Sequence, residues 1–428
     1  MKIKGILSVI FLVVGIVFIP SLVFAGSGGE GLTLQDALQK AYSQNPEIAA
    51  FEARASAEEA LIPSRYSLSN PKVGLMHENL MNLMQVQMGP MTSFSVSQEL
   101  LFPTKYFTQG AAQKAKSKAS HHEFLEKKLE VRQRVLSSYF GVYAADRILA
   151  LLEAQKETLR EIARIAEARR ATGGVPQQDE MKAHVEQTRL ENEILLQKQE
   201  IVDLRAQLNA LLNLDPSENI ILPKQDIKAP RFTKSAEETQ QLALKGSKVI
   251  AGMHDSLEAA KNEKSLAQQS YLPDFMFSYR KPFTNTPSGA FAAGVELSIP
   301  LWFLTKQRSE VSAASFKAQE AEKNLELATR TTQAESKSIA SKVETYTNLI
   351  KVYETALIPQ AATTLNSSRA AYAAGRVGFQ ELLDSERSLY SIRIDYYRTL
   401  AKFVENLTQL ERISGTSLSS LPFDGEII

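Results

Sequence analysis

The residues best suited to chemistry are soft metal ligands gathered in one short segment. One histidine and five methionines fall between positions 76 and 91, and they are Met76, His77, Met81, Met84, Met88 and Met91. Thioethers favour Cu(I), and imidazole suits copper or zinc. Methionine is also a flexible filler of apolar surfaces. The pattern therefore predicts packing or contact with a membrane rim first, and a metal contact as the alternative.

No other set of residues resembles a catalytic site. His121 and His122 are neighbours in a helical stretch, where adjacent side chains point to different sides, so a solvated pair is expected. Paired carboxylates such as Glu58-Glu59 lie in polar helical stretches, where a solvated face is expected. The sequence contains no glycine-rich phosphate loop and no His-Glu-x-x-His motif. We therefore predict no enzymatic activity and no bound cofactor.

The bulk composition excludes several further classes of protein. The 428 residues are 44% hydrophobic and 23% charged, which is typical of a folded chain. A net charge of +1 gives no sign of a nucleic-acid partner. Because there is no cysteine, the chain has no disulfide, no thiolate metal site, no cysteine nucleophile and no lipid on an N-terminal cysteine.

Residues 1–25 have the composition of an export signal. Lys2 and Lys4 precede an apolar stretch over residues 6–19, and Val23-Phe24-Ala25 is an acceptable cleavage site. An uncleaved N-terminal anchor is the alternative, although the apolar stretch is short for a membrane span. No second apolar run reaches about 18 residues, so any further entry into a membrane is expected to use β-strands.

The remaining chain consists of two halves that repeat at a constant offset. Ile250 follows Ile48 by 202 residues (250 − 48), and the same offset separates Pro71 from Pro273 and Gly173 from Gly375. A constant offset across separate landmarks indicates duplication. We predict repeats over residues 26–214 and 235–415, a proline-containing linker at 215–234 and a tail at 416–428.

Long helices dominate both halves. No proline occurs from Thr104 to Thr172, and apolar residues recur every seven positions, as in Val135, Val142 and Leu149. This period is typical of helices that pack as coiled coils. A helix of that extent would be about 100 Å long. In the second half, the sequence predicts a similar long helix from Thr305 to Ala374, interrupted only by Pro359.

Four shorter segments alternate between apolar and polar residues. They span residues 72–86, 91–101, 273–283 and 290–300, and Phe275, Phe277 and Tyr279 illustrate the apolar positions. Their lengths suit tilted transmembrane strands, and a small soluble sheet that caps a helical domain is the alternative. Because about eight strands are needed to close a barrel, several copies would have to share one, and three copies would supply twelve strands.

The order of elements resembles the TolC family of outer-membrane efflux proteins over residues 32–415. The opening Leu34-Gln35-Asp36-Ala37-Leu38 with Asn45-Pro46 is similar to the family's first helix. The resemblance implies a mainly α chain whose homotrimer forms a twelve-stranded outer-membrane β-barrel and an α-helical periplasmic tunnel. It also implies two partners, which are a periplasmic adaptor and an inner-membrane pump of the RND type.

The segment from Ser97 to Lys105 is similar to the strand-to-helix junction of heavy-metal efflux channels, in the copper/silver and cobalt–zinc–cadmium groups. Those channels commonly carry glycine where this chain has Thr104, and some are lipoproteins, which a cysteine-free chain cannot be. The resemblance implies export of heavy-metal ions. A drug-efflux outlet, a type I secretion outlet and a non-channel periplasmic coiled-coil protein stay as alternatives.

The turns between the long helices are the predicted periplasmic tip. We expect their glycines to take left-handed conformations and their apolar residues to contact the adaptor; the set is Gly173, Gly174, Val175, Pro176, Gly375, Val377, Gly378 and Phe379. Charged residues beside the turns are the gate candidates, with ordinary surface charge as the alternative; they are Asp179, Glu180, Arg369, Arg376, Glu381 and Asp384.

Overall fold

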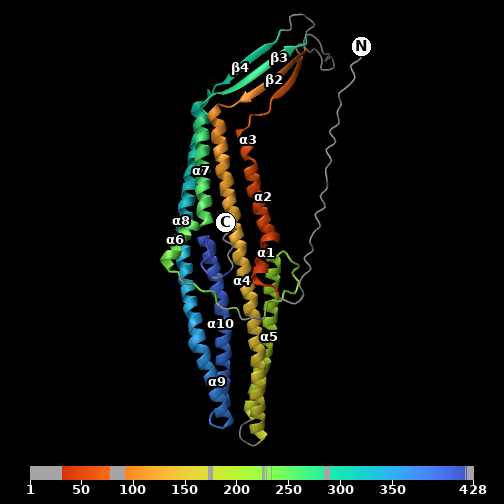
Figure 1. The fold of residues 1–428 in the computed structure, drawn as a ribbon, viewed down its shortest axis with the longest axis vertical. Helices are drawn as coiled ribbons and strands as arrows, with labels where there is room; N and C mark the ends of the chain where they lie inside the picture. The colour runs from red at the N-terminus through yellow and green to blue at the C-terminus, as the bar shows by residue number, and fades with distance from the viewer. Residues whose placement is uncertain are drawn as a thin grey trace, which may run out of the picture.

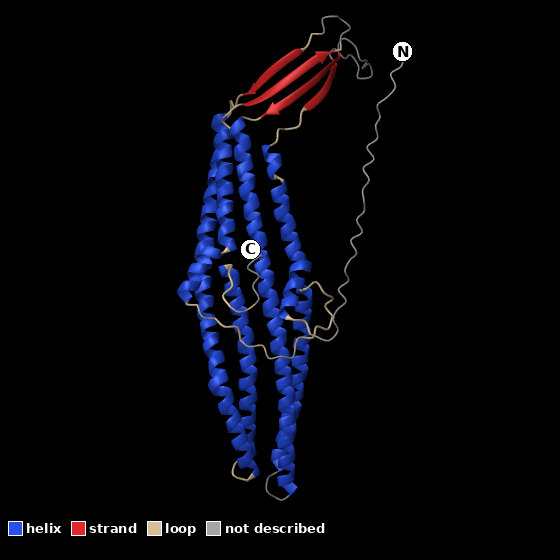
Figure 2. Cartoon of the chain, viewed as in Figure 1, coloured by secondary structure: helices blue, strands red, loops and turns tan. Residues whose placement is uncertain are grey.

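The chain forms a long bundle of helices with a four-stranded sheet at one end (Figures 1 and 2). The computed structural model describes residues 31–77, 92–171, 177–223, 227, 229–232, 234–283, 290–419 and 421. The predicted signal segment and the loop methionines at positions 81, 84, 88 and 91 lie outside these residues. The predicted mainly α architecture with a small β part is confirmed.

The two halves contain corresponding elements in the same order. The first half consists of α1 (Leu34–Gln44), α2 (Pro46–Ala60), α3 (Ile62–Tyr66), β1 (Lys72–His77), β2 (Thr92–Leu100), α4 (Pro103–Ala171) and α5 (Gln177–Leu211). The second half consists of α6 (Ala236–Gly246), α7 (Lys248–Gln269), β3 (Asp274–Pro282), β4 (Ala292–Ser298), η2 (Phe303–Gln307), α8 (Arg308–Val352), η3 (Tyr353–Leu357), α9 (Ile358–Ala373) and α10 (Phe379–Ser414). Between Leu211 and Ala236 the described residues form neither helix nor strand.

Helix α4 packs against helices of both halves of the chain. It begins with Pro103 in its first turn, a position where the missing N–H of proline costs nothing, and it continues for 69 residues. It contacts α2 and α7 toward the sheet and α5 and α10 along the rest of its length (Figure 1). One window of α4 is apolar and long enough to cross a membrane, but 56% of that window is buried, as in the core helix of a soluble protein. Charged residues such as Asp146 and Arg147 interrupt the apolar part of α4, so this window is not an uninterrupted apolar run.

The second half departs from the prediction of one helix interrupted only by Pro359. Two π-helical turns, η2 and η3, flank α8, and η3 ends directly before Ile358 and Pro359. A proline inside a helix lacks the N–H of one backbone hydrogen bond, and its ring collides with the carbonyl of the fourth preceding residue. The wider π turn accommodates this collision without ending the helix.

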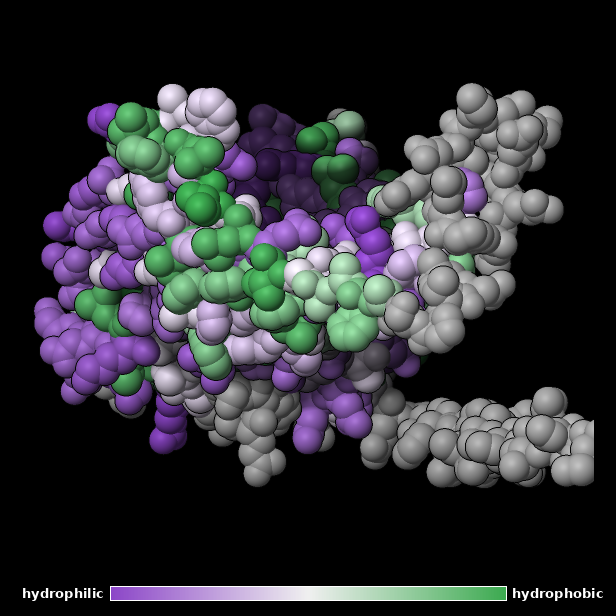
Figure 3. Space-filling view, turned by 90° about the horizontal axis from the view of Figure 1, so that it is seen from above, coloured by the Kyte–Doolittle hydropathy of each residue, from purple (hydrophilic) through white to green (hydrophobic). Residues whose placement is uncertain are grey.

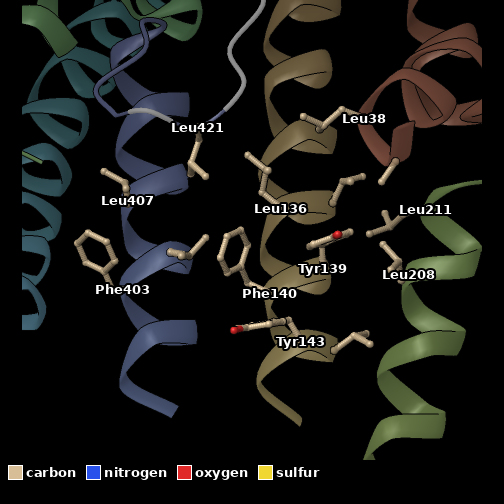
Figure 4. Packing of buried hydrophobic residues seen from close by; sticks show 14 of the residues in the cluster. Leu38, Leu136, Tyr139, Phe140, Tyr143, Leu208, Leu211, Phe403, Leu407 and Leu421 are labelled. Atoms are coloured by element: carbon tan, nitrogen blue, oxygen red, sulfur yellow. The ribbon is translucent and has the colours of Figure 1, made fainter. Parts of the chain in front are cut away.

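The main hydrophobic core lies midway along the bundle, where both repeats meet (Figure 4). Phe140 and Tyr143 of α4 point toward Phe403 of α10 on one side, and Tyr139 points toward Leu208 and its neighbours on α5 on the other. Each such side chain stabilises the fold by about 1.5–3 kcal/mol through burial. The chain after α10 returns to this core with Leu418 and Leu421, so the described start of the C-terminal tail packs against the middle of the molecule.

The four strands form one antiparallel sheet in the order β1-β2-β3-β4. Pairing of β2 with β3, for example Val96 with Tyr279, joins the two halves of the chain. Strands β2, β3 and β4 lie within the predicted ranges and are slightly shorter. Strand β1 is described as far as His77, and the rest of the predicted range to residue 86 lies outside the described residues. In this single sheet, β1 and β4 are the two outer strands.

Candidate functional site: the sheet and the hairpin tips

The sheet has one apolar and one polar face. The strand register places the large apolar side chains on one side, and these are Val73, Leu75, Phe94, Val96, Phe275, Phe277, Tyr279, Val295 and Leu297. The other side carries mainly small or charged residues, which are Gly74, Ser93, Ser95, Ser97, Glu99, Ser278, Arg280, Gly294 and Glu296, with Met76 and Met276 among them. Gln98 and Lys281 are polar residues on the apolar side. Most of the apolar set is exposed in the single chain. Apolar side chains gather in one band at the sheet end of the molecule (Figure 3). A sheet of this kind can separate lipid from water.

The structure does not bring the described members of the methionine segment together. Met76 lies on the polar face opposite Ser93, whereas His77 lies on the apolar face, where its Nδ1 is 2.7 Å from Oγ1 of Thr92. Adjacent residues of a strand point to opposite sides, so Met76 and His77 do not form a common ligand pair. Among the described residues, no group of three or more His, Asp or Glu side chains could hold a metal ion.

A buried ion pair joins the sheet to the helices. Lys105 near the start of α4 places its Nζ 2.8 Å from both carboxylate oxygens of Asp274 at the start of β3. The same carboxylate accepts a hydrogen bond from the backbone N–H of Phe102, and Nζ donates to the carbonyl of Leu272. The segment that resembles the metal-efflux junction is thus the joint between the sheet and the long helix.

The turn between α9 and α10 is closed by Gly375. This glycine has a φ of +75°, its N–H donates to the carbonyl of Tyr372, and the N–H of Arg376 donates to the carbonyl of Ala371. This pair of bonds is a Schellman motif, in which a left-handed residue satisfies the last carbonyls of a helix. Gly378 instead precedes α10 with a φ of −78°, so the expected left-handed conformation is wrong at this position. The other predicted turn residues, at 173–176, lie outside the described residues.

Phe379 is not the exposed contact that the sequence suggests. Its side chain is only 2% exposed and lies edge-on against Tyr372, with ring centroids 5.9 Å apart. Val377 is half-buried against the same cluster, which also contains Leu159 and Leu382. An apolar residue at the first position of α10 is buried here because the two hairpins close over it. Phe379 therefore stabilises the tip and does not present a surface to a partner.

Among the gate candidates, Arg369 forms an ion pair with a residue of another helix. Its Nη2 on α9 lies 2.6 Å from Oε2 of Glu161 on α4, and so links the two hairpins. The described polar contacts of the Asp384 side chain stay within α10, where Gln380 donates to it at 3.0 Å and Arg387 lies at 3.5 Å. Arg376 and Glu381 are exposed, Asp179 is half-buried, and Glu180 lies in α5.

Several ion pairs that link the helices near the tip could not be predicted from the sequence. Arg387 of α10 forms an ion pair with Glu186 of α5, and Lys156 of α4 pairs with Glu191 of α5 at 2.6 Å. Repeated charges on a helix surface do not say which partner each one meets. The burial of Glu386 could have been predicted from the sequence. It occupies a position in the apolar stripe of its helix, which includes Leu382, Leu383, Leu389 and Tyr390.

His122 departs from the expected solvated pair. It is half-buried between α4 and α7, and its Nε2 lies 3.4 Å from Oδ2 of Asp255. Burial lowers the pKa of His122, with Asp255 opposing that effect, so the ring is mostly neutral at neutral pH. His121 is exposed on the next position of the helix. The two rings therefore have separate surroundings, and His122 has a packing role.

Comparison with known proteins agrees with this geometry. The chain matches the family model of the outer membrane efflux protein twice, over residues 37–214 and 239–416. CzcC of Cupriavidus metallidurans, a cobalt-zinc-cadmium resistance protein, is 24% identical over 288 residues, which cover 67% of this chain and 68% of that protein. The outer membrane protein TolC of Vibrio cholerae is 21% identical over 384 residues, covering 86% and 85% of the two chains.

The fold is also that of a solved structure. The outer membrane protein VceC of Vibrio cholerae superposes with a TM-score of 0.77 at 16% identity, over 90% of this chain and 96% of that one. A long helical bundle that carries a four-stranded antiparallel sheet, together with the double family match, defines a transport channel of the outer membrane, and not an enzyme. The chain belongs to the outer membrane efflux protein family, and the predicted TolC-like resemblance is confirmed.

Proposed function

We propose that three copies of this chain form the exit duct of a tripartite efflux system. The observation that carries the proposal is the sheet, which has a largely apolar face and an outer strand on each side, β1 and β4. An outer strand facing lipid would leave backbone groups unpaired, so β4 of one copy pairs with β1 of the next. Three four-stranded sheets give a twelve-stranded barrel, wide enough for a lumen.

The rest of the chain fits the same assembly. The polar face of each sheet lines the lumen, and the long helices extend that lumen as a periplasmic tunnel. Residues 1–25 direct export and are cleaved after Ala25, and the two repeats arose by duplication. At the far end, the hairpin tips dock a periplasmic adaptor that is joined to an inner-membrane pump of the RND type.

We infer that the cargo is heavy-metal ions. The similarity to a cobalt-zinc-cadmium resistance protein supports this cargo, and so does the junction segment around Lys105. The similarity to TolC supports the second candidate, a drug-efflux or type I secretion outlet. The Met76–Met91 segment is a possible point of contact for the metal, and no resident metal is required.

Growth of a strain lacking this protein tests the cargo directly. The strain is grown across graded copper, silver, zinc, cobalt and cadmium, beside a panel of dyes and antibiotics. Sensitivity confined to metals, restored by the intact gene, is the expected result. Sensitivity to drugs and detergents alone would contradict the metal cargo and support the second candidate. The duct itself is tested on the purified protein, which should be a heat-modifiable trimer that needs detergent; a soluble monomer would contradict it.

We also propose that ion pairs at the tip hold the duct closed until the adaptor docks. Arg369 and Glu161 supply a link between hairpins. Asp179, Glu180, Arg376, Glu381 and Asp384 are the further gate candidates beside the helix turns. Arg369→Glu should increase entry of large antibiotics, and adding Glu161→Arg should restore the barrier. Asp384→Lys should also increase leak. Unchanged permeability in both single variants would exclude this gate.

A further inference from the structure

A carboxyl group is buried between the two hairpins, two positions from the exposed gate candidate Asp384 on α10. Glu386 lies on α10 two helical turns from Phe379, and it is 1% exposed. It lines a cavity of about 350 Å³ formed by α4, α5 and α10, together with Gln155, Glu186 and Leu383. Charged side chains are rarely buried unless they are paired, so this position calls for a physical explanation.

Glu386 makes a polar contact across the hairpins. Nε2 of Gln155 on α4 donates to its Oε2 at 3.3 Å, and beside it Oγ1 of Thr158 lies 2.9 Å from the hydroxyl of Tyr390. No described protein group forms a hydrogen bond with the other oxygen, Oε1. A neutral carboxyl group suits this setting. One neutral hydrogen-bond donor does not offset the cost of burying an ionised carboxylate.

The cations around the cavity already have carboxylate partners of their own. On α10, Arg387 pairs with Glu186 and Asp384, and Arg398 lies 3.6 Å from Asp395. On α5, Arg189 lies 3.5 Å from Glu193, and on α9, Arg369 pairs with Glu161 of α4. These pairs leave Glu386 without a cation that is dedicated to it.

These surroundings set the titration of Glu386. Burial raises its pKa to about 7, while Gln155, Arg387 and Arg369 oppose the rise and Glu186 adds to it. A carboxyl whose pKa is raised in the packed state favours that state while it is protonated. The packed state is fully favoured below the ordinary value of 4.5, and the advantage is lost as the pH rises through about 7.

We propose that Glu386 is a proton-operated lock between the two hairpins, which keeps the periplasmic tip closed under acid conditions and releases it as the pH rises. The proposal rests on the proposed function as a duct. When the carboxyl is neutral, α10 stays packed on α4 through the Gln155 contact. When it ionises, the uncompensated charge favours a state in which α10 separates and water reaches the cavity. The hydrophobic cluster at the tip lies within two helical turns of Glu386. Separation of α10 from α4 therefore loosens the packing of Tyr372, Phe379 and Leu382.

The test measures single-channel conductance of the purified, reconstituted protein from pH 5.5 to 8.5. The ratio of open to closed channels should rise by up to about tenfold per pH unit as Glu386 titrates below pH 7, and then level off. Glu386→Gln should hold the ratio low and independent of pH. Glu193→Gln, which changes an exposed carboxylate of the same cavity, should keep the wild-type pH dependence.

Other outcomes separate the lock from the duct. A wild-type channel that conducts equally at all pH values would overturn the lock and leave the duct intact, as would a Glu386→Gln channel that responds like the wild type. A wild-type protein that never conducts would contradict the duct itself. Assembly is checked by the heat-modifiable trimer on gels, and Glu386→Met, a second uncharged variant, should give the same flat profile as Glu386→Gln.

Discussion

At the residue scale, Gly375 and Gly378 form a matched pair of glycines in one turn. Gly375 has a φ of +75°, whereas Gly378 has a φ of −78° and nothing within 4 Å of an added Cβ. Gly375→Ala should cost about 1–2 kcal/mol, because an L side chain is strained in the left-handed region. Gly378→Ala should be nearly neutral, because a less flexible unfolded chain offsets the weaker helix cap.

Thermal dissociation of the detergent-solubilised protein measures both effects. A lower midpoint for Gly375→Ala than for Gly378→Ala is expected. Equal midpoints would contradict the prediction that alanine is strained in the left-handed conformation at position 375. Conductance of both variants serves as a control for assembly.

A second residue-scale prediction concerns the buried pair of Arg132 and Glu411. Nη1 of Arg132 on α4 lies 2.9 Å from Oε2 of Glu411 on α10, and the same glutamate accepts hydrogen bonds from Ser419 and the N–H of Leu418. Arg132→Met should destabilise the fold by about 3–5 kcal/mol, because it leaves a buried carboxylate without its partner. Adding Glu411→Leu should recover part of the loss. Urea unfolding compares the wild type, Arg132→Met, Glu411→Leu and the double variant, and additive losses would contradict the coupling.

The candidate site was only partly predictable at this scale. Spacing identifies Gly375 as a turn residue, since few other residues reverse a long helix so tightly. It does not show that Phe379 is buried, because exposure depends on how close the second hairpin lies. It also does not select Glu161 as the partner of Arg369, since long helices carry many surface charges within reach of one another.

At the element scale, periodicity defines the strands and helices well, because each element has one buried or apolar face over its full length. The long helix from Pro103 is predicted within one residue at each end. The two π turns beside α8 are not predicted, because a π turn keeps the composition of a helix and changes only its hydrogen bonds.

The two faces of the sheet give a test for which the cysteine-free chain is well suited. Ser97 lies on the polar face of β2, and its neighbour Val96 lies on the apolar face. In reconstituted protein, Ser97→Cys should react with a charged, water-soluble thiosulfonate. Val96→Cys should resist that reagent and react with a lipid-soluble maleimide. The reverse pattern would show that the lumen and lipid sides are exchanged.

At the scale of the whole molecule, we expect the single tryptophan to lie where the membrane ends. Trp302 follows β4 between Leu301 and Phe303, and its side chain is 74% exposed in the single chain. Tryptophan favours the interface between lipid and water. In vesicles its fluorescence should be shifted to shorter wavelength and quenched by lipids brominated near the headgroup. Quenching by aqueous iodide alone would place the rim of the membrane elsewhere, and resistance to both quenchers would place Trp302 between copies.

The register of the sheet also has a consequence for the time course of folding. Phe94 of β2 pairs with Lys281 of β3, and 187 positions separate them (281 − 94). Closing so long a loop is slow compared with forming helical hairpins from local contacts. The α4–α5 hairpin should therefore form first, because its contacts lie within one repeat, while β2 stays without β3 until the second repeat has been synthesised. During that interval the apolar strands are prone to aggregate, so the nascent chain would depend on escort by a chaperone until its sheet closes.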